Sequence, residues 1–250
     1  GTIYVGTGGG IFEGGLSFEG SGVTSGDGIW YSQDDGETFQ QLDGTNGEDI
    51  TKVIAADTTV TNTIYYSGAS LGVKKVVDLG TPSSVNDVPT ATTGDIKVSN
   101  DGQVLITGVS QGGQRTWVSQ DGGNTWTDLH SNGQLTGSGA GRSEYAISSF
   151  KNANGFYTLY ACFVTNSGAL KGVYRSIDNG TNWCQIGPGA TTGFAPFGDN
   201  TQGLYDCVIA SHPTEDGCIL GGIDLWKWTQ TPGTSCDNGQ WEIVSSWAAS

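Results

Sequence analysis

The octapeptide Ser119-Gln120-Asp121-Gly122-Gly123-Asn124-Thr125-Trp126 carries the pattern Ser-x-Asp-x-Gly-x-x-aromatic. The same pattern begins twice more in this 250-residue chain, at Ser32 and at Ser176. Three copies make an internal repeat, and repeats of one supersecondary unit stack to build a whole fold. The defining positions are Ser32, Asp34, Gly36 and Phe39 in the first copy, Ser119, Asp121, Gly123 and Trp126 in the second, and Ser176, Asp178, Gly180 and Trp183 in the third.

We interpret each copy as the turn of a β-hairpin. An aspartate carboxylate accepts hydrogen bonds from turn amides, a serine hydroxyl adds a second bond to the backbone, and glycine supplies the positive φ of a reversal. The closing aromatic residue then starts the return strand. A carboxylate that already accepts several amide hydrogen bonds is a poor proton shuttle. Asp34, Asp121 and Asp178 are therefore predicted to be structural rather than catalytic.

The three octapeptides resemble the Asp-box, also called the BNR repeat, of β-propellers. The resemblance implies that each forms the turn between the third and fourth strands of a four-stranded antiparallel blade. Asp-box propellers include sialidases, xyloglucan-degrading glycosidases, sortilin-type receptors, photosystem assembly factors and large secreted proteins of Bacteroidetes-like bacteria. The opening is most similar to the last group, with Ile3-Tyr4-Val5-Gly6-Thr7-Gly8-Gly9-Gly10 followed by Gly28-Ile29-Trp30-Tyr31-Ser32. A fold that enzymes, receptors and scaffolds share does not specify an activity.

Five units of this kind are expected to form the blades of a single all-β propeller domain over residues 1–250. Their approximate ranges are 1–45, 50–80, 94–130, 143–187 and 203–245. The first unit lacks its first strand, and the second has three strands and no octapeptide. Residues 81–93 are expected to form a loop. The fifth unit is expected to begin with a strand at Leu204–Ala210 and keeps only a turn and an aromatic residue of the repeat, in Asp237-Asn238-Gly239-Gln240-Trp241.

The chain is expected to be an incomplete segment of a larger propeller. A closed propeller completes its first blade with a strand from the other end of the chain, whereas Ser245–Ser250 shows no strand pattern. An open ring would expose unpaired strand edges. Further blades or domains of the same polypeptide are therefore the expected partners, and the first residue, which is glycine rather than methionine, also indicates a processed chain or a fragment.

The charge composition of the chain argues against two other classes of partner. The chain has 10 Lys and Arg against 25 Asp and Glu, a formal net charge of −15. Nucleic acid and anionic lipid both attract cationic surfaces, so neither is expected to bind. No apolar run approaches the ~20 residues of a membrane span. The 42 glycines and the charged fraction of only 14% suit short strands and tight turns, and we expect a secreted or cell-surface protein.

All five cysteines lie in the last part of the chain, at Cys162, Cys184, Cys207, Cys218 and Cys236. The absence of a Cys-x-x-Cys pair, with only two histidines in the chain, argues against a zinc site. Cys207 and Cys218 flank a predicted hairpin turn and are candidates for a disulfide, and Cys236 could pair with either neighbour. One cysteine is left unpaired in any scheme. Disulfides favour an oxidising, extracytoplasmic compartment.

A sialidase-like activity is the strongest enzymatic hypothesis, because the resemblance includes sialidases. That family grips the sugar carboxylate with three arginines and uses a Tyr/Glu nucleophile pair with an Asp acid/base. Arg115 and Arg175 lie on strands that enter an octapeptide, at the wrong end of a blade for that site. Arg142, Glu144 and Tyr145 are the candidate catalytic residues, expected on a loop at the opposite end. The N-terminal motifs of the sialidases and of the xyloglucan-degrading family are missing, so we lean towards no enzymatic activity.

A binding role is the competing hypothesis. Aromatic residues on loops stack on sugars or meet protein partners, and the alternative is that they pack between blades. Calcium binding at Asp34-Asp35 is conceivable, but the self-engaged turn is favoured, and no other metal or cofactor is expected. The sequence favours a non-catalytic secreted or cell-surface propeller domain for adhesion to a protein or glycan ligand. The alternative is a sialidase-like glycoside hydrolase domain with part of its site outside this chain. The candidate binding aromatics are Phe12, Phe18, Phe194, Phe197 and Trp247.

Overall fold

Five antiparallel β-sheets make up nearly all of the regular structure. The computed structural model describes residues 1–8, 26–56, 62–68, 70–85, 88, 92–110, 114–135, 141–188, 193–198, 202–231 and 235–246. The first sheet has three strands and each of the others has four. A single helical turn, α1 (Gly203–Asp206), precedes the fifth sheet.

Each sheet is a meander in which the strands pair in chain order. The first sheet contains β1 (Ile3–Gly6), β2 (Ile29–Ser32) and β3 (Gln40–Gln41). The second contains β4 (Ile50–Ala56), β5 (Thr63–Gly68), β6 (Gly72–Val77) and β7 (Ser83–Ser84). The third contains β8 (Thr92–Val98), β9 (Leu105–Ser110), β10 (Gln114–Ser119) and β11 (Thr127–Asp128). The fourth contains β12 (Arg142–Lys151), β13 (Tyr157–Val164), β14 (Leu170–Ser176) and β15 (Cys184–Gly187). The fifth contains β16 (Val208–Ser211), β17 (Gly217–Gly221), β18 (Leu225–Gln230) and β19 (Gly239–Ser245).

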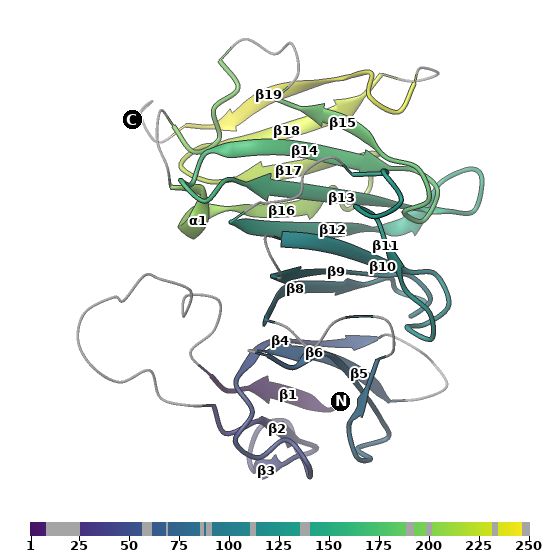
Figure 1. The fold of residues 1–250 in the computed structure, drawn as a ribbon, viewed down its shortest axis with the longest axis vertical. Helices are drawn as coiled ribbons and strands as arrows, with labels where there is room; N and C mark the ends of the chain where they lie inside the picture. Colours follow the sequence, from purple (N-terminus) through teal and green to yellow (C-terminus); the bar gives the residue numbers. More distant parts are fainter. Residues whose placement is uncertain are drawn as a thin grey trace.

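The sheets follow one another in space as they do in the sequence. Figure 1 shows β1–β3 at the bottom, followed upwards by β4–β6 and β8–β9, with the strands of the fourth and fifth sheets overlapping in the upper half. The first strand of each sheet contacts the first strand of the next, in the pairs β1 with β4, β4 with β8, β8 with β12 and β12 with β16. Within each sheet the later strands therefore lie progressively further from this shared inner row.

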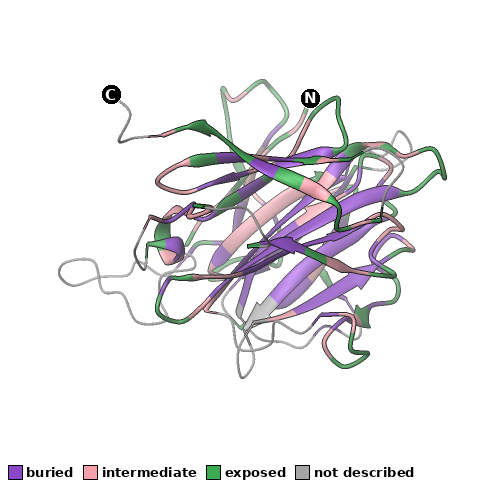
Figure 2. Cartoon of the chain, turned by 90° about the horizontal axis from the view of Figure 1, so that it is seen from above, coloured by how far each residue is buried: buried purple, intermediate pink, exposed green. Residues whose placement is uncertain are grey.

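Apolar cores fill the spaces between consecutive sheets. Ile29 of the first sheet packs with Ile64 and Tyr66 of the second. The next two cores join the second sheet to the third and the third to the fourth. The last core joins Tyr160 of the fourth sheet to Trp228 of the fifth. Figure 2 shows the buried residues running through the inner strands, with exposed residues at the turns and along the last strand.

β13 shows how one strand serves two cores. All eight of its residues are buried. Leu159 and Phe163 belong to the core shared with the third sheet, whereas Tyr160 and Val164 belong to the core shared with the fifth. Successive side chains of a strand point to opposite faces, so a strand packed on both faces is apolar at nearly every position.

Two segments differ from the sequence-based prediction. The segment 81–93, predicted as a loop, contains β7, which pairs with Lys74 and Lys75 of β6, and the start of β8. Two serines carry no apolar pattern that would reveal a strand. The strand predicted at Leu204–Ala210 begins only at Val208, after α1. The Arg142 guanidinium donates to the carbonyls of Leu204 and Tyr205, a tertiary contact that the local sequence does not contain.

The disulfide pairing also differs from the expectation. Cys184 of β15 is bonded to Cys236, with a Cα–Cα separation of 6.1 Å, and Cys162, Cys207 and Cys218 are buried thiols. The proposed Cys207–Cys218 pair is wrong because the β16–β17 register places Cys218 opposite Ser211. Cys207 lies before the other end of β16. Three cysteines are therefore unpaired in this structure, rather than one.

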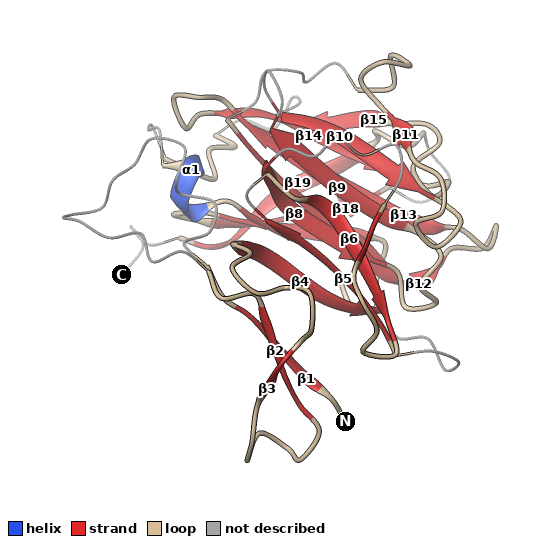
Figure 3. Cartoon of the chain, turned by 60° about the horizontal axis from the view of Figure 1, so that its bottom comes forward, coloured by secondary structure: helices blue, strands red, loops and turns tan. Residues whose placement is uncertain are grey.

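The helical turn α1 and the β12–β13 turn lie at opposite ends of the strands. Figure 3 shows α1 at one edge of the molecule, away from the long hairpins at the opposite ends of β12 and β13. Within the part of the chain that the structure describes, no helix is long and apolar enough to cross a membrane.

Phe163 of β13 should be far more important for stability than Phe156 of the β12–β13 turn. Phe163 is fully buried and meets the ring of Tyr174 edge-on at 5.5 Å between centroids, whereas Phe156 is 41% exposed. Phe163→Ala should lower the free energy of unfolding by about 3–5 kcal/mol, because it removes a buried ring and leaves a cavity. Phe156→Ala deletes the same atoms at an exposed position and should cost less than about 1 kcal/mol. Urea unfolding of both variants measures the difference, and equal losses would contradict the proposed core.

Candidate functional site

The three octapeptide turns share one hydrogen-bond pattern. In each turn the serine hydroxyl donates to the aspartate Oδ1 and accepts a bond from the glycine N–H four residues further on. The Oγ–Oδ1 distances are 2.7 Å for Ser32–Asp34 and 2.8 Å for Ser119–Asp121 and Ser176–Asp178. The N–Oγ distances are 2.8 Å for Gly36 and 2.9 Å for Gly123 and Gly180.

Each aspartate uses both carboxylate oxygens inside its own turn. In the first two turns, the residue four positions later is a threonine, whose N–H bonds Oδ1 at 2.9 Å and whose hydroxyl bonds Oδ2 at 2.6 Å. In the third turn Asn182 makes the same two bonds, at 2.9 and 2.7 Å. The oxygens that would have to accept a substrate proton are thus already occupied.

These bonds lower the pKa of the turn carboxylates. The hydroxyl and N–H of Thr38, followed by the Ser32 hydroxyl, lower the pKa of Asp34 from 3.8 to about 2. Partial burial acts to raise the pKa of Asp121, but the bonds from Thr125 and Ser119 outweigh it and the pKa falls to about 2. The same balance lowers the pKa of Asp178. A carboxylate with so low a pKa is a weak general base and is ionised at any physiological pH.

Two of the turns also contact the sheet that precedes their own. The Gly122 carbonyl, in the turn of the third sheet, accepts a bond of 2.7 Å from the buried hydroxyl of Tyr65 in β5. In the fourth sheet, a Cβ added to Gly180 would lie 2.8 Å from Cγ2 of Val118 in β10. The turn backbone is therefore packed against the neighbouring sheet, which supports a structural role.

The fifth sheet keeps more of the turn than the sequence suggested. Ser235 donates to Oδ1 of Asp237 at 2.6 Å, the same serine–aspartate contact as in the other turns. We expected only the turn and Trp241 to be retained. The octapeptide pattern did not predict this contact, because the turn Ser235–Trp241 is one residue shorter than the octapeptides. Residues 231–234 also separate it in the sequence from the end of β18.

The candidate catalytic residues Arg142, Glu144 and Tyr145 lie on β12 rather than on a loop. The Nε and Nη2 of Arg142 donate to Glu144 Oε1 at 3.1 and 2.8 Å. Its Nη1 and Nη2 also donate to the carbonyls of Leu204 and Cys207, at 2.6 and 2.9 Å. The guanidinium is thus committed to holding the start of the fifth sheet, and a loop was predicted because Gly139-Ala140-Gly141 precedes it.

A buried charge network surrounds Glu144. Burial, followed by the nearby charge of Asp95, raises the pKa of Glu144. The Asp95 side chain is only 2% exposed, with Lys97 Nζ at 2.8 Å and Lys52 Nζ at 3.5 Å from Oδ1, and its Oδ2 accepts the N–H of Tyr145 at 3.0 Å. These residues belong to β4, β8 and β12, so the network joins the first strands of three consecutive sheets.

The other two arginines are engaged as well. Arg115 pairs with Asp128 in β11. Arg175 is buried, pairs with Asp216 and lies over the ring of Trp228 at 4.9 Å from its centroid. With Arg142 also committed, the three guanidinium groups do not converge on one site in the manner that a sialic acid carboxylate requires.

A cleft with a volume of about 640 Å³ lies between the fourth and fifth sheets. It is lined by residues of the β12–β13 turn and the β16–β17 turn and by Arg175, which is buried. Arg175 Nη1 donates to Oε1 of Gln230 at 2.6 Å and to the Cys236 carbonyl at 3.0 Å. The lining residues are Asn152, Ala153, Asn154, Arg175, Ile177, Glu215, Asp216, Thr229, Gln230 and Cys236.

The sequence predicted the hairpin turn between Cys207 and Cys218, but it gave no sign that this turn faces the β12–β13 turn. They are about 60 residues apart, and only the packing of consecutive sheets makes them face one another. The cleft offers amide and carboxylate groups beside the apolar surface of Ala153 and Ile177, the mixture found in small-ligand sites. Among the described residues, no group of three or more His, Cys, Asp or Glu side chains could hold a metal ion.

Two of the predicted binding aromatics pack inside the protein. Phe194 stacks on Trp241 with 4.4 Å between ring centroids, and Phe197 is 2% exposed. Both extend the core between the fourth and fifth sheets. Phe12, Phe18 and Trp247 lie outside the described residues.

Comparisons with known proteins identify the fold. No protein-family model matches the sequence, and no curated protein matches it. Among solved structures, a GH74 enzyme of Niastella koreensis superposes with a TM-score of 0.65 at 17% identity, over 98% of this chain and 36% of that chain. A GH74 xyloglucanase from Xanthomonas campestris gives 0.62 at 14% identity, over 98% and 37%.

A third structure, the Dos1 propeller, superposes with a TM-score of 0.55 at 13% identity, over 91% of this chain and 57% of that chain. At these identities the likeness concerns the fold alone. The all-β propeller fold predicted from the sequence is confirmed, and the five sheets are its blades. The chain spans just over a third of the length of the two GH74 structures.

The turn carboxylates should make stability fall in acid. The pKa of Asp121 is about 2 in the folded protein, below its ordinary 3.8, so the ionised form favours folding. This contribution is complete above about pH 5 and is lost as the pH falls from about 4 towards 2. Asp121→Asn should therefore destabilise the protein at pH 7 and progressively less below pH 4, as measured by urea unfolding at several pH values.

Asp35→Asn is the matched control, because Asp35 is in the equivalent turn of the first sheet but its side chain is 95% exposed. It should leave the unfolding free energy within about 0.5 kcal/mol at every pH. A pH-independent loss in Asp121→Asn would show that the charge of the carboxylate is unimportant to the turn.

Proposed function

We propose that this chain is a non-catalytic, extracytoplasmic propeller domain that binds a protein or glycan ligand. Its ligand site is the cleft between the fourth and fifth sheets, and its three octapeptide turns are Asp-boxes of the kind found in large secreted bacterial propeller proteins. The cleft carries the proposal. Its volume of about 640 Å³ lies within the range of small-ligand sites, which suits a short oligosaccharide or a peptide loop of a partner.

The charges at the cleft favour a neutral or cationic ligand. Arg175 is compensated by Asp216, and its side chain is only 2% exposed. Asp216 and Glu215 are 42% and 54% exposed at the rim, and Glu215 is partly balanced by Lys227 at 3.0 Å. The exposed charge at the cleft is therefore acidic, and the net charge of −15 also disfavours anionic partners such as nucleic acid.

We propose that the chain lacks enzymatic activity because its turn carboxylates are hydrogen-bonded and Glu144 and Asp95 are buried. Glycoside hydrolysis needs two carboxylates that face one another across a bound sugar. The turn carboxylates are bonded within their turns, and Glu144 and Asp95 are buried in a charge network. The cleft contains the adjacent pair Glu215 and Asp216 on one wall, without a described carboxylate on the other.

An extracytoplasmic location is supported by the Cys184–Cys236 disulfide, since disulfides persist mainly in oxidising compartments. The propeller fold by itself carries no function. The GH74 names of two similar structures keep glycoside hydrolysis as the alternative, with part of the site in further blades of the same polypeptide. No cofactor is part of the proposal.

Filling the cleft tests the proposal. Ala153 is exposed on the β12–β13 turn, so Ala153→Trp should fold normally and occupy the cleft with an indole ring. Neutral and anionic oligosaccharides and a panel of peptides are screened against the purified chain, and the affinity of the strongest binder is measured by calorimetry. We expect a neutral or cationic ligand, with affinity lowered by about tenfold or more in Ala153→Trp, a loss of about 1.4 kcal/mol.

Gln103→Trp is the matched control, because it places the same side chain at an exposed position in the corresponding turn of the third sheet, outside the cleft. It should bind as the unmodified chain does. Binding that is unaffected by Ala153→Trp would remove the cleft from the proposal, binding to no probe would contradict it, and release of reducing sugar would favour the hydrolase alternative.

A further inference from the structure

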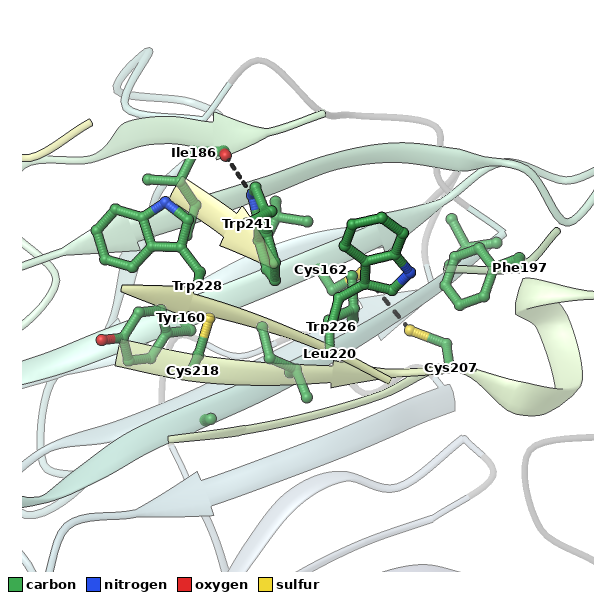
Figure 4. Close-up of a cluster of buried hydrophobic side chains, with 14 residues drawn as sticks. Tyr160, Cys162, Ile186, Phe197, Cys207, Cys218, Leu220, Trp226, Trp228 and Trp241 are labelled. Carbon is green, nitrogen blue, oxygen red and sulfur yellow. Dashed lines mark hydrogen bonds between the residues drawn. The ribbon is translucent and has the colours of Figure 1, made fainter. Parts of the chain in front are cut away.

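Two of the three free thiols are in contact in the core between the fourth and fifth sheets. The Sγ atoms of Cys162 and Cys207 are 3.5 Å apart, and both residues are buried, at 0% and 2% exposure. Figure 4 shows these two thiols directed at one another beside Trp226, whereas Cys218 lies at a distance from this contact, beside Tyr160. The structure thus singles out one pair among the three thiols.

The two thiols come from segments that differ in how firmly they are held. Cys162 lies in the middle of β13, opposite Glu144 on one side and Val173 on the other. Cys207 follows α1, and its carbonyl accepts a bond of 2.9 Å from Arg142. Bond formation requires the sulfurs to approach from 3.5 Å to about 2.05 Å, a movement of roughly 1.5 Å that side-chain rotation and a small shift of the α1 segment can supply.

We propose that Cys162 and Cys207 are a redox-active pair that forms a second disulfide, and that Cys218 is retained as a thiol. The first disulfide, Cys184–Cys236, already links the same two sheets, so the proposal requires no redox environment beyond the one that forms this bond. The pair is separated by 45 residues in the chain, and its closure would leave the single unpaired cysteine that an odd number of cysteines demands.

The oxidant is a disulfide, either a small molecule such as glutathione disulfide or a disulfide-bonded oxidoreductase. The Cys207 thiolate attacks one sulfur of the oxidant, which releases one thiol and leaves a mixed disulfide on Cys207. Cys162 then loses its proton and attacks the Cys207 sulfur, which expels the second thiol. In sum, two protein thiols and one disulfide become one protein disulfide and two thiols, so atoms and electrons balance.

The order of attack follows from the surroundings of each sulfur. Cys162 is in the centre of a sheet, and the neighbouring Cys207 thiol, together with burial, raises the pKa of Cys162. Cys207 lies at the end of a four-residue helix whose N-cap makes no side-chain hydrogen bond, and such a short element opens at low cost. Cys207 is therefore the first to meet an oxidant, and Arg142, which holds the α1 carbonyls, controls how often it does so.

The two disulfides would secure the fourth and fifth sheets near opposite ends of their strands. Cys184 pairs with Arg175 near the turn end of β14, whereas Cys207 lies at the α1 end. Closing a loop of this length restricts the unfolded chain, and we expect the midpoint of thermal unfolding to rise by about 5–10 °C on oxidation.

Thiol mapping of the whole chain tests the pair. The protein is incubated with glutathione disulfide, quenched in acid, unfolded with an alkylating agent and digested. We expect a Cys162–Cys207 cross-linked peptide, the Cys184–Cys236 peptide, and alkylation at Cys218 alone. Alkylation of all three core thiols after prolonged incubation would overturn the proposal, as would a cross-link to Cys218.

Variants distinguish oxidation of the Cys162–Cys207 pair from general reactivity of the buried thiols. Cys218→Ala should still form the Cys162–Cys207 cross-link, and Cys162→Ala should leave Cys207 alkylated or glutathionylated. Arg142→Gln should accelerate oxidation several-fold by freeing the α1 carbonyls. If Arg142→Gln fails to fold, partial urea titration of the unmodified chain supplies the same readout, since oxidation should then accelerate before global unfolding begins. An oxidation rate that follows only global unfolding would contradict the proposed local opening.

Discussion

Every inner sheet of this protein has two apolar faces, and the architecture follows from the need to bury both. Adjacent residues of β5 illustrate the constraint, because Tyr65 packs towards the third sheet while Tyr66 packs towards the first. A single four-stranded sheet with this composition could not remain exposed on either side. Stacking in chain order satisfies each face with the next repeat, and each added sheet creates one new core without disturbing the earlier ones. Towards the end of β19, the last described strand, Ile243 and Val244 are about half exposed.

The octapeptide turns add contacts between sheets to those of the apolar cores. Two consecutive residues with left-handed φ reverse the chain in each octapeptide: Asp35 and Gly36, Gly122 and Gly123, and Asn179 and Gly180. Aspartate, asparagine and glycine tolerate this conformation better than other residues. The compact reversal brings the turn backbone against the previous sheet, where Tyr65 binds the Gly122 carbonyl. In the fifth sheet a covalent bond takes over this task, because Cys236 is linked to Cys184 and Trp241 Nε1 donates to the Ile186 carbonyl at 2.7 Å.

The sequence predicted those features that depend on residues close together in the chain. The octapeptide pattern predicted the hydrogen bonds within its own turns. The role of Arg142 could not be predicted, because its partners are carbonyls about 60 residues away. The cysteine pairing failed for a related reason, since the register of β16 and β17 separates Cys207 from Cys218. The cleft could not be predicted from the sequence because two adjacent sheets form it together, and neither of its turns has a ligand-binding pattern of its own.

The distribution of charge is the basis for proposing binding rather than catalysis. Acid–base chemistry requires a carboxylate whose pKa lies near the working pH and whose oxygens face a substrate. The turns bind their aspartates too tightly, and the Asp95–Glu144 network is buried beneath two lysines and Arg142. The cleft proposed as a ligand site is lined by the turns at Asn152–Asn154 and Glu215–Asp216 and by Cys236, whose disulfide has no counterpart in the three octapeptide turns. Asp216 is held by Arg175 and Tyr160. The exposed residues Ala153 and Asn154 can vary without loss to the cores. The proposed ligand site therefore lies where the repeat is least regular, between the fourth and fifth sheets.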